Sequence, residues 1–341
     1  MMSEFCYPND TEDDITDENI FYKFNKFQED MGLRVRGYKK DKNVSNFTQY
    51  ILKDGNYVPM QSTILELPAG CYKPTINQYN GDICATPKEI VLPHLYNLPN
   101  NLHKELLDDI KHFWESEERY RKFGNVYKRN ILLYSVPGNG KTSLINQICQ
   151  QVINDYNGLV MSIDDEEGLE TYPKLMQKIR QIEPKRKIVT VIEDFERLVQ
   201  KDYLSALLLQ ILDGTEQFDG VVTVATTNYP NKINKQYTAR PSRFNIIREY
   251  KKPDAKVRKF YITNKLADAG IIIDEKVGED IDRYVKNSEG FTFDYMKEVI
   301  EAMFVGEIPE DEAFNKIKDS IKKDGEYKTT DEEPTKLGFG R

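Results

Sequence analysis

The sequence predicts an α/β fold, in which a parallel sheet flanked by helices is followed by a helical lid and preceded by a small β-rich domain. Between Arg129 and Tyr250, β-branched runs of strand length alternate with amphipathic helices, which is typical of a parallel sheet. After Pro253 the pattern is helical only. Between residues 46 and 92 the chain has short β runs. There the residues Tyr-Asn-Gly-Asp at 79–82 indicate a hairpin, because Asn and Gly tolerate positive φ.

These patterns divide the chain into five segments. Residues 1–19 carry seven acidic residues and no Lys or Arg, so we expect an acidic disordered tail. Residues 20–99 form the expected N-terminal β-rich domain, with a short helix over Ile20–Met31. Residues 100–252 form the α/β core, residues 253–320 the helical lid, and residues 321–341 a polar, disordered C-terminal tail. At the start of the core, Asn101 can cap a helix with one apolar face.

Composition narrows the class of protein. A hydrophobic fraction of 39% is enough for a packed core, and a formal net charge of −8 argues against a protein that mainly coats nucleic acid. The four cysteines lie far apart and form no C-x-x-C pair, which is typical of thiols in a reducing compartment. No stretch approaches the ~18 apolar residues of a membrane span. We therefore predict a cytoplasmic protein without a membrane partner.

The strongest motif runs from Asn130 to Ser143. An apolar strand leads into a glycine-bearing loop and then an amphipathic helix, which is the order that a P-loop requires. Backbone N–H groups and the positive end of the helix can then hold phosphate oxygens. Ser135 stands where the first Gly of the motif is expected, and Ser is small enough for the turn. The motif predicts that Lys141 reaches the β- and γ-phosphates of ATP and that Thr142 ligates Mg²⁺, within a set of phosphate-contacting residues comprising Pro137, Gly138, Asn139, Gly140, Lys141, Thr142 and Ser143.

Polar side chains follow two later apolar strands. Glu193 and Asp194 come directly after the strand that begins near Lys187, and Asn228 follows the strand from Val221 to Ala225. A P-loop enzyme needs one acid to hold Mg²⁺ and a second to polarise the attacking water. We expect Glu193 to support the metal and Asp194 to activate the water, with help from Asn228. A solvated acidic turn and an ordinary turn asparagine are the alternatives.

With these three elements, the chain resembles the AAA ATPases, and in particular the subgroup that contains the mitochondrial translocase of the Rieske protein. The likeness covers about residues 102–301, and four segments carry it: 127–134 before the phosphate loop, Ile-Glu-Asp-Phe-Glu at 192–196, Leu-Leu-Leu-Gln-Ile-Leu-Asp-Gly at 207–214, and Thr-Thr-Asn at 226–228. The resemblance implies ATP hydrolysis at the subunit interfaces of a homo-oligomeric, hexamer-like ring, with a protein client. The membrane anchor of the translocase is absent from this sequence.

Two further segments are similar to family motifs. Arg-Pro-Ser-Arg-Phe at 240–244 resembles the segment whose arginines reach the nucleotide of the neighbouring subunit, so Arg240 and Arg243 are implied to act in trans. The alternative is that both arginines pair with local acids. Gly-Phe-Thr-Phe-Asp at 290–294 resembles a turn of the helical lid, with the structural role of completing the wall of the adenine pocket.

The family's pore loop has only a poor counterpart here. Leu169 and Tyr172 lie in the corresponding segment, but they do not form the aromatic-apolar-glycine motif that grips polypeptide. We therefore do not expect threading of an unfolded chain. We expect remodelling or assembly of a protein partner, docked by the N-terminal domain or by the tails, of which residues 334–341 form one candidate peptide.

Two other classes of function remain open from the sequence. A nucleic-acid loader or motor could use the basic segment from Arg34 to Lys42, although the net charge of −8 makes a nucleic-acid partner the less favoured interpretation. A nucleotide-gated scaffold with little turnover is compatible with Ser135 and with the Glu-Asp order of the two acids.

Overall fold

The computed structural model describes residues 44–45, 49–53, 56–60, 63–78, 81–90, 98, 101–213 and 218–328. The chain divides into a first unit, Met1–Leu67, and a second unit, Pro68–Arg341. The expected acidic tail, the helix over 20–31, the basic segment over 34–42 and the candidate docking peptide at 334–341 lie outside the described residues.

The first unit contains two small antiparallel pairs of strands. Strand β1 (Val44–Ser45) pairs with β4 (Thr63–Ile64), and β2 (Gln49–Lys53) pairs with β3 (Asn56–Met60). The β character predicted for this part of the chain is therefore present. Two-stranded ladders are only marginally stable by themselves.

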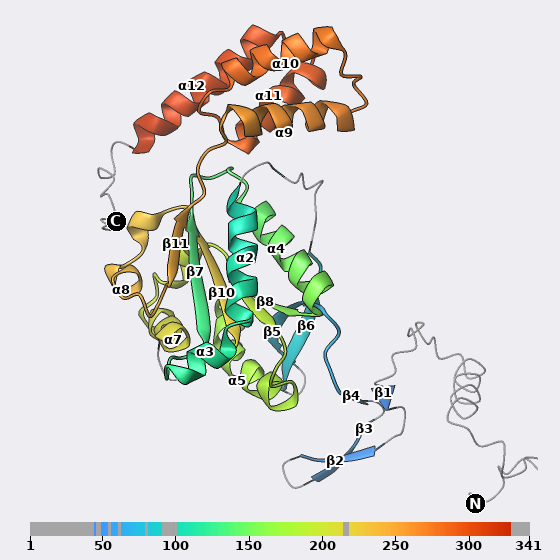
Figure 1. The fold of residues 1–341 in the computed structure, drawn as a ribbon, viewed down its shortest axis with the longest axis vertical. Coiled ribbons are helices and arrows are strands. Elements are labelled where there is room, and N and C mark those ends of the chain that lie inside the picture. Colours follow the sequence, from blue (N-terminus) through green and yellow to red (C-terminus); the bar gives the residue numbers. More distant parts are fainter. Residues whose placement is uncertain are drawn as a thin grey trace, which may run out of the picture. The chain divides into compact units, whose positions relative to one another are not determined.

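The second unit is built on a seven-stranded sheet with the order β11-β7-β10-β9-β8-β5-β6. Every neighbouring pair is parallel except β5 and β6, which are antiparallel. The strands are β5 (Gly70–Ile76), β6 (Ile83–Lys88), β7 (Lys128–Tyr134), β8 (Leu159–Ile163), β9 (Ile188–Ile192), β10 (Val221–Thr227) and β11 (Ile246–Glu249). A mostly parallel sheet flanked by helices confirms the predicted fold class (Figure 1).

The boundary between the N-terminal domain and the core differs from the one expected at residue 99. Strands β5 and β6 lie within residues 20–99, yet β5 pairs with β8 through the register Gly70↔Leu159 and extends the core sheet. This pairing buries Cys71 and Tyr72, which gives the strand its place in the core. The predicted hairpin connects β5 to β6, and Gly81 has the positive φ of 70° that the turn requires.

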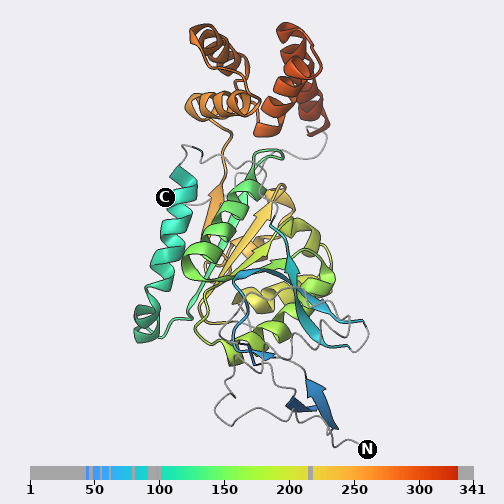
Figure 2. The same cartoon turned by 90° about the vertical axis from the view of Figure 1, so that its right-hand side faces the viewer.

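Helices cover both faces of the sheet. On one face lie α2 (Asn101–Trp114) and α4 (Lys141–Tyr156), with α3 (Glu117–Lys122) between them in the chain. Their apolar side chains pack with those of Ile131 and Leu133. From β8 the chain returns through β9 to β10, against the direction of the first crossover. Because crossovers between parallel strands are right-handed, the helices of this return lie on the opposite face of the sheet (Figure 2). They are α5 (Glu166–Ile182), α6 (Phe195–Leu198) and α7 (Asp202–Asp213). The short η2 (Pro230–Lys232) and α8 (Lys235–Thr238) precede β11.

The lid consists of four helices with a core of their own. They are α9 (Ala255–Asp268), α10 (Glu275–Asn287), α11 (Phe293–Phe304) and α12 (Glu310–Lys328). Phe291, Met296 and Phe314 are buried among them. Helix α12 continues past residue 320, where the sequence predicted that a disordered tail begins. Its apolar residues Phe314, Ile317 and Ile321 recur at helical spacing and hold this part of the helix in the lid.

Candidate functional site

The phosphate loop predicted from the sequence lies between β7 and α4. Gly138 and Gly140 adopt φ of 72° and 83°, a region that costs residues with a side chain about 1–2 kcal/mol. Ser135 does not adopt positive φ, so a glycine is not required there. The loop therefore keeps its glycines where the backbone needs them, and it leads into the first turn of α4 at Lys141.

The Lys141 ammonium lies under the loop and is only 8% exposed. Its Nζ donates to Ser135 Oγ at 2.8 Å and to Asn228 Oδ1 at 2.5 Å. Burial lowers the pKa of Lys141, although three carboxylates oppose this effect: Glu196, Asp194 and Glu193. The ammonium is thus a partly desolvated cation, and an anionic phosphate group would offset the cost of its burial.

Two residues of the predicted magnesium set meet at the start of α4. Thr142 Oγ1 donates to Glu193 Oε2 at 2.6 Å. The two side chains are 51 residues apart in the chain, and the parallel arrangement of β7, β10 and β9 brings them together. Hydroxyl and carboxylate oxygens are the hard ligands that Mg²⁺ prefers, so this pair fits that metal.

Asp194 and Asn228 form the next part of the site. Asn228 Nδ2 donates to Asp194 Oδ1 across 3.5 Å, while its Oδ1 accepts from Lys141. The amide thus connects the ammonium to the second carboxylate. Asp194 has a φ of 49° and is one of three described non-glycine residues with positive φ. Aspartate tolerates this region better than most residues, and the conformation turns its side chain toward Asn228.

Glu196 is a member of this cluster to which the sequence analysis gave no role. Its side chain is 4% exposed, and Oε1 accepts from the Asn228 N–H at 3.4 Å. Its Oε2 is buried and has no hydrogen-bond partner among the described residues. The signal in the sequence was a third acid within four residues after β9. Its burial could not be foreseen, because it depends on the contact with β10.

The Asn139 side chain holds the phosphate loop in place. Its side chain is buried at 1% exposure, and Nδ2 donates to the carbonyl oxygens of Tyr250 and Lys251 at 2.7 and 2.9 Å. The amide therefore ties the loop to the segment after β11 instead of pointing at a phosphate. Pro137 is exposed and Ser143 half-buried. Both residues, and Asn139 through its backbone N–H, remain predicted members of the phosphate-contacting set.

The comparison with known families matches this site. Residues 131–252 match the ATPase family associated with various cellular activities (AAA). The matched stretch contains the P-loop, the acids after β9 and Asn228 after β10. The chain carries an AAA domain. The resemblance predicted from the sequence is thereby confirmed.

Several relatives are similar to part of this chain. "Probable mitochondrial chaperone bcs1" of Schizosaccharomyces pombe is 30% identical over 160 residues, which cover 44% of this chain and 34% of the relative. "Probable mitochondrial chaperone BCS1-A" of Dictyostelium discoideum is 47% identical over 55 residues, 16% of this chain and 13% of the relative. "ATP-dependent zinc metalloprotease FtsH" of Ralstonia pickettii is 24% identical over 205 residues, which cover 55% of this chain and 28% of the relative. The chain spans about a third or less of the length of these relatives.

None of the helices in the described part of the chain is both long and apolar enough to span a membrane. The relatives named as chaperones are mitochondrial by name. The cytoplasmic location indicated by the sequence stays a prediction.

The two arginines of the AAA domain's 240–244 segment differ in position. Arg240 is exposed, whereas the Arg243 side chain is only 12% exposed. Arg243 Nη1 donates to the Gln236 carbonyl oxygen at 2.5 Å, and its Nε lies 3.5 Å from Asp213 Oδ2. Arg243 thus lies beside an acid of its own chain, as in the alternative that the sequence left open. Arg240 has no ion pair among the described residues, and the action of either arginine on a neighbouring subunit stays a prediction.

The lid turn at 290–294 packs directly on the phosphate loop. The Asp294 N–H donates to the Gly138 carbonyl oxygen at 3.1 Å. A Cβ at Gly138 would lie 2.7 Å from Asp294 Oδ2, and one at Gly140 would lie 3.3 Å from the Phe293 ring. These contacts explain why both positions need glycine for space as well as for φ. The wall of an adenine pocket remains the predicted role of the turn.

The two residues compared with the pore loop, Leu169 and Tyr172, are buried. Leu169 and Tyr172 belong to α5 and are 0% and 1% exposed, and the Tyr172 hydroxyl shares a hydrogen bond of 2.7 Å with Thr190 Oγ1. Side chains buried in this way are not exposed to grip a polypeptide. Their position agrees with the expectation that this segment does not thread a chain.

Proposed function

We propose that this chain binds Mg-ATP in its AAA domain and hydrolyses it at the interfaces of a ring of identical subunits. The observation that supports this most directly is the hydrogen bond of 2.6 Å between Thr142 and Glu193. It joins the head of the P-loop helix to the acid after β9, which is where a P-loop enzyme holds its metal.

The phosphates of ATP would lie along the loop from Gly138 to Thr142. The Lys141 ammonium would replace its hydrogen bonds to Ser135 and Asn228 by hydrogen bonds to phosphate oxygens. The new bonds join two charged groups and are therefore stronger than those to neutral partners. Thr142 and Glu193 would hold Mg²⁺, which would supply positive charge to offset the negative charge that develops during phosphoryl transfer. The metal needs few protein ligands, since Mg²⁺ normally keeps several waters.

Asp194 is the proposed base for the attacking water. Its carboxylate is half-buried and is oriented by Asn228, while Glu196 accepts from the Asn228 N–H and fixes that residue from the other side. A carboxylate held in this way can accept a proton from a water that Asn228 orients. Glu193 accepts a hydrogen bond from Thr142, the other proposed magnesium ligand. This contact supports a metal-binding role for Glu193 and leaves Asp194 as the proposed base.

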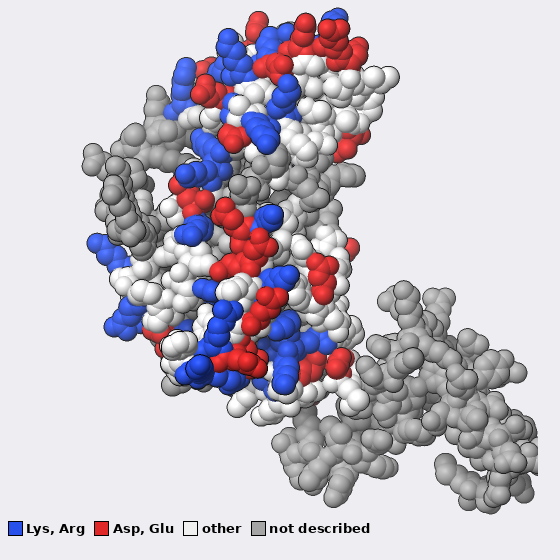
Figure 3. All heavy atoms as spheres, viewed as in Figure 1, with Lys and Arg blue, Asp and Glu red and all other residues white. Residues whose placement is uncertain are grey.

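The proposed work of the ATPase is to remodel or assemble a protein partner. The names of two relatives contain the word chaperone, and residues 1–67 and the C-terminal segment lie outside the stretch that matches the AAA family, so they are the proposed docking segments. In the view of Figure 3, Lys and Arg side chains are interspersed with Asp and Glu over the described residues. That face has no extended basic surface of the kind that tracks nucleic acid.

Asp194→Asn is expected to retain affinity for Mg-ATP and to lower its turnover by about 10²–10⁴-fold, the usual contribution of a general base. Asparagine is preferred to alanine at this position, because asparagine tolerates the φ of 49° and alanine does not. The measurements are steady-state phosphate release and equilibrium titration with ATP. Asp202→Asn at the start of α7 is the control. Wild-type protein that binds Mg-ATP but releases no phosphate would replace this proposal with that of a nucleotide-gated scaffold.

Glu196→Gln tests the positioning of Asn228. Glutamine keeps an oxygen to accept from the Asn228 N–H but removes the charge near Lys141. We expect a fall in turnover of about tenfold, because a charge-assisted hydrogen bond is replaced by a weaker neutral one, with a smaller change in the KM for ATP. Glu196→Ala should lower turnover further, because it also removes the acceptor. Equal activity of the wild type and Glu196→Ala would contradict a positioning role.

A further inference from the structure

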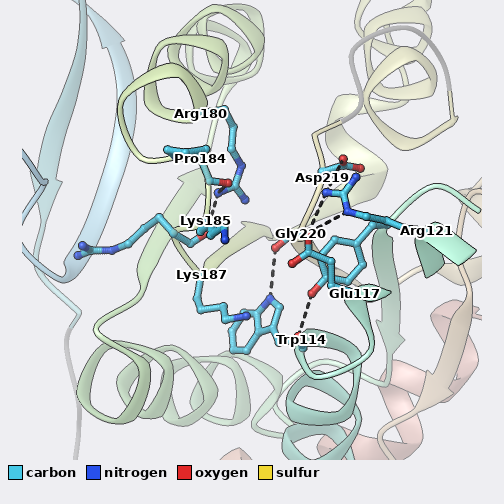
Figure 4. A pocket seen from close by; sticks show the side chains of 11 residues that line it. Trp114, Glu117, Arg121, Arg180, Pro184, Lys185, Lys187, Asp219 and Gly220 are labelled. Carbon is cyan, nitrogen blue, oxygen red and sulfur yellow. Dashed lines mark hydrogen bonds and ion pairs between the residues drawn. The ribbon is translucent and has the colours of Figure 1, made fainter. Parts of the chain in front are cut away.

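A second cavity lies at the opposite end of the sheet from the phosphate loop. Trp114, Arg180, Lys187 and Gly220 line it, together with residues that precede β9 and β10 (Figure 4). The acids and Asn228 of the AAA site follow these same two strands. Each strand is at least five residues long, so the two sites are roughly 16 Å or more apart.

Cations outnumber carboxylates in the lining of the cavity. Five Lys and Arg side chains line it together with two carboxylates, Glu117 and Asp219. One of the five, Arg186, is paired with Glu183 at 3.1 Å. Both carboxylates already contact Arg121, at 2.8 and 3.5 Å. Among the described residues, Arg180, Lys185 and Lys187 form no ion pair that would offset their charge. The cavity therefore carries an excess of positive charge.

Arg180 presents an unused pair of donors. Its Nη1 donates to the carbonyl oxygens of Arg186 and Pro184 at 2.7 and 3.5 Å, which fixes the plane of the guanidinium. Its Nε and Nη2 are buried and have no acceptor among the described residues. These two N–H groups form the edge of the guanidinium that binds both oxygens of a phosphate or carboxylate.

Lys187 and Gly220 complete the cavity. Lys187 Nζ lies 5.6 Å from the centre of the Trp114 ring, so the ammonium is positioned by a cation–π contact. Gly220 has a φ of 73°, and a Cβ there would lie 3.7 Å from Arg180 Nη2 and 3.3 Å from the Tyr127 ring. A side chain at position 220 would therefore stand against the Nη2 edge of the Arg180 guanidinium. Burial lowers the pKa of both Arg180 and Lys187, as expected for cations that are short of an anionic partner.

We propose that this cavity is a second binding site, which takes a phosphate group carried by a small molecule. Its volume is about 40 Å³. One water needs roughly 10–15 Å³ of such space, so the cavity holds one phosphate-sized group and not a whole nucleotide. A phosphate dianion matches the Arg180 edge and two further lysines better than a single carboxylate, which carries half the charge.

The emission of Trp114 can report binding in the cavity, because Trp114 lines the cavity and is the single tryptophan of the chain. Inorganic phosphate is titrated into the full-length Lys141→Ala protein, so that the AAA site does not contribute, at ionic strength held constant with chloride. We expect a saturable change in Trp114 emission and a matching heat in calorimetry. Acetate should give neither.

Lys187→Gln and Lys185→Gln should each weaken phosphate binding by about tenfold, the effect of losing one charged hydrogen bond. Arg180→Gln should abolish phosphate binding. If the Arg180→Gln protein does not fold, the two lysine variants test the proposal without it. Lys178→Gln, which removes an exposed charge from the same α5 helix outside the cavity, should bind as the parent does. Absence of saturable binding by both methods would overturn the proposal, as would equal affinities of the Lys187→Gln and Lys178→Gln proteins.

Discussion

Replacement of Lys141 by alanine is expected to abolish measurable ATP hydrolysis and to weaken Mg-ATP binding by at least about a hundredfold. Lys141 is the buried ammonium of the phosphate loop, and its Nζ already makes two short hydrogen bonds at the position where phosphate oxygens would bind. Each charge-assisted hydrogen bond contributes about 1.5–3 kcal/mol. Loss of two such bonds corresponds to a change in affinity of more than a hundredfold.

The control for this variant is Gln150→Ala, which changes an exposed residue on the same helix α4. Both variants should unfold cooperatively, so that a loss of binding is assigned to the site. Equilibrium titration with Mg-ATP and steady-state phosphate release are the measurements. Unchanged affinity of Lys141→Ala for Mg-ATP would remove the basis of the proposed function.

The sequence predicted the parts of the site that are encoded locally. A P-loop needs a strand, a glycine-bearing loop and a helix in immediate succession, so Gly138, Gly140 and Lys141 could be placed from the order of residues alone. The meeting of Thr142 with Glu193 also followed, because parallel strands place their carboxyl ends at one edge of a sheet.

The features that depend on distant partners were not predictable in this way. Strands β5 and β6 have the residues of any β hairpin, and only their fit against β8 decides that they join the core sheet. Similarly, the position of Arg243 depends on Asp213, which lies 30 residues earlier in the chain and shares the ion pair. Glu196 and Asn139 are polar residues whose burial is set by contacts with β10 and with the segment after β11.

Arg240→Ala is expected to lower ATP turnover by about 10³-fold or more, the effect of removing an arginine that stabilises charge on a transferring phosphoryl group. Arg240 is exposed, and no ion pair of its side chain is present in the described part of the chain, so its removal should leave stability nearly unchanged. Arg243→Ala is the comparison. It should lower the free energy of unfolding, because it leaves the partly buried Asp213 with less compensation.

The proposed action of Arg240 on a neighbouring subunit gives this prediction a second measurement. If the guanidinium acts on the nucleotide of the neighbouring subunit, specific activity of the wild type should rise with protein concentration as rings assemble. Mixing Arg240→Ala with wild-type protein should then lower activity below the sum of the two, because each variant subunit inactivates the site of its neighbour. Mixing with Asn234→Ala, an exposed change at the start of α8, should have no such effect. Full activity of a monomer would show that the reaction is completed within one chain, and it would exclude Arg240 as a residue acting between subunits.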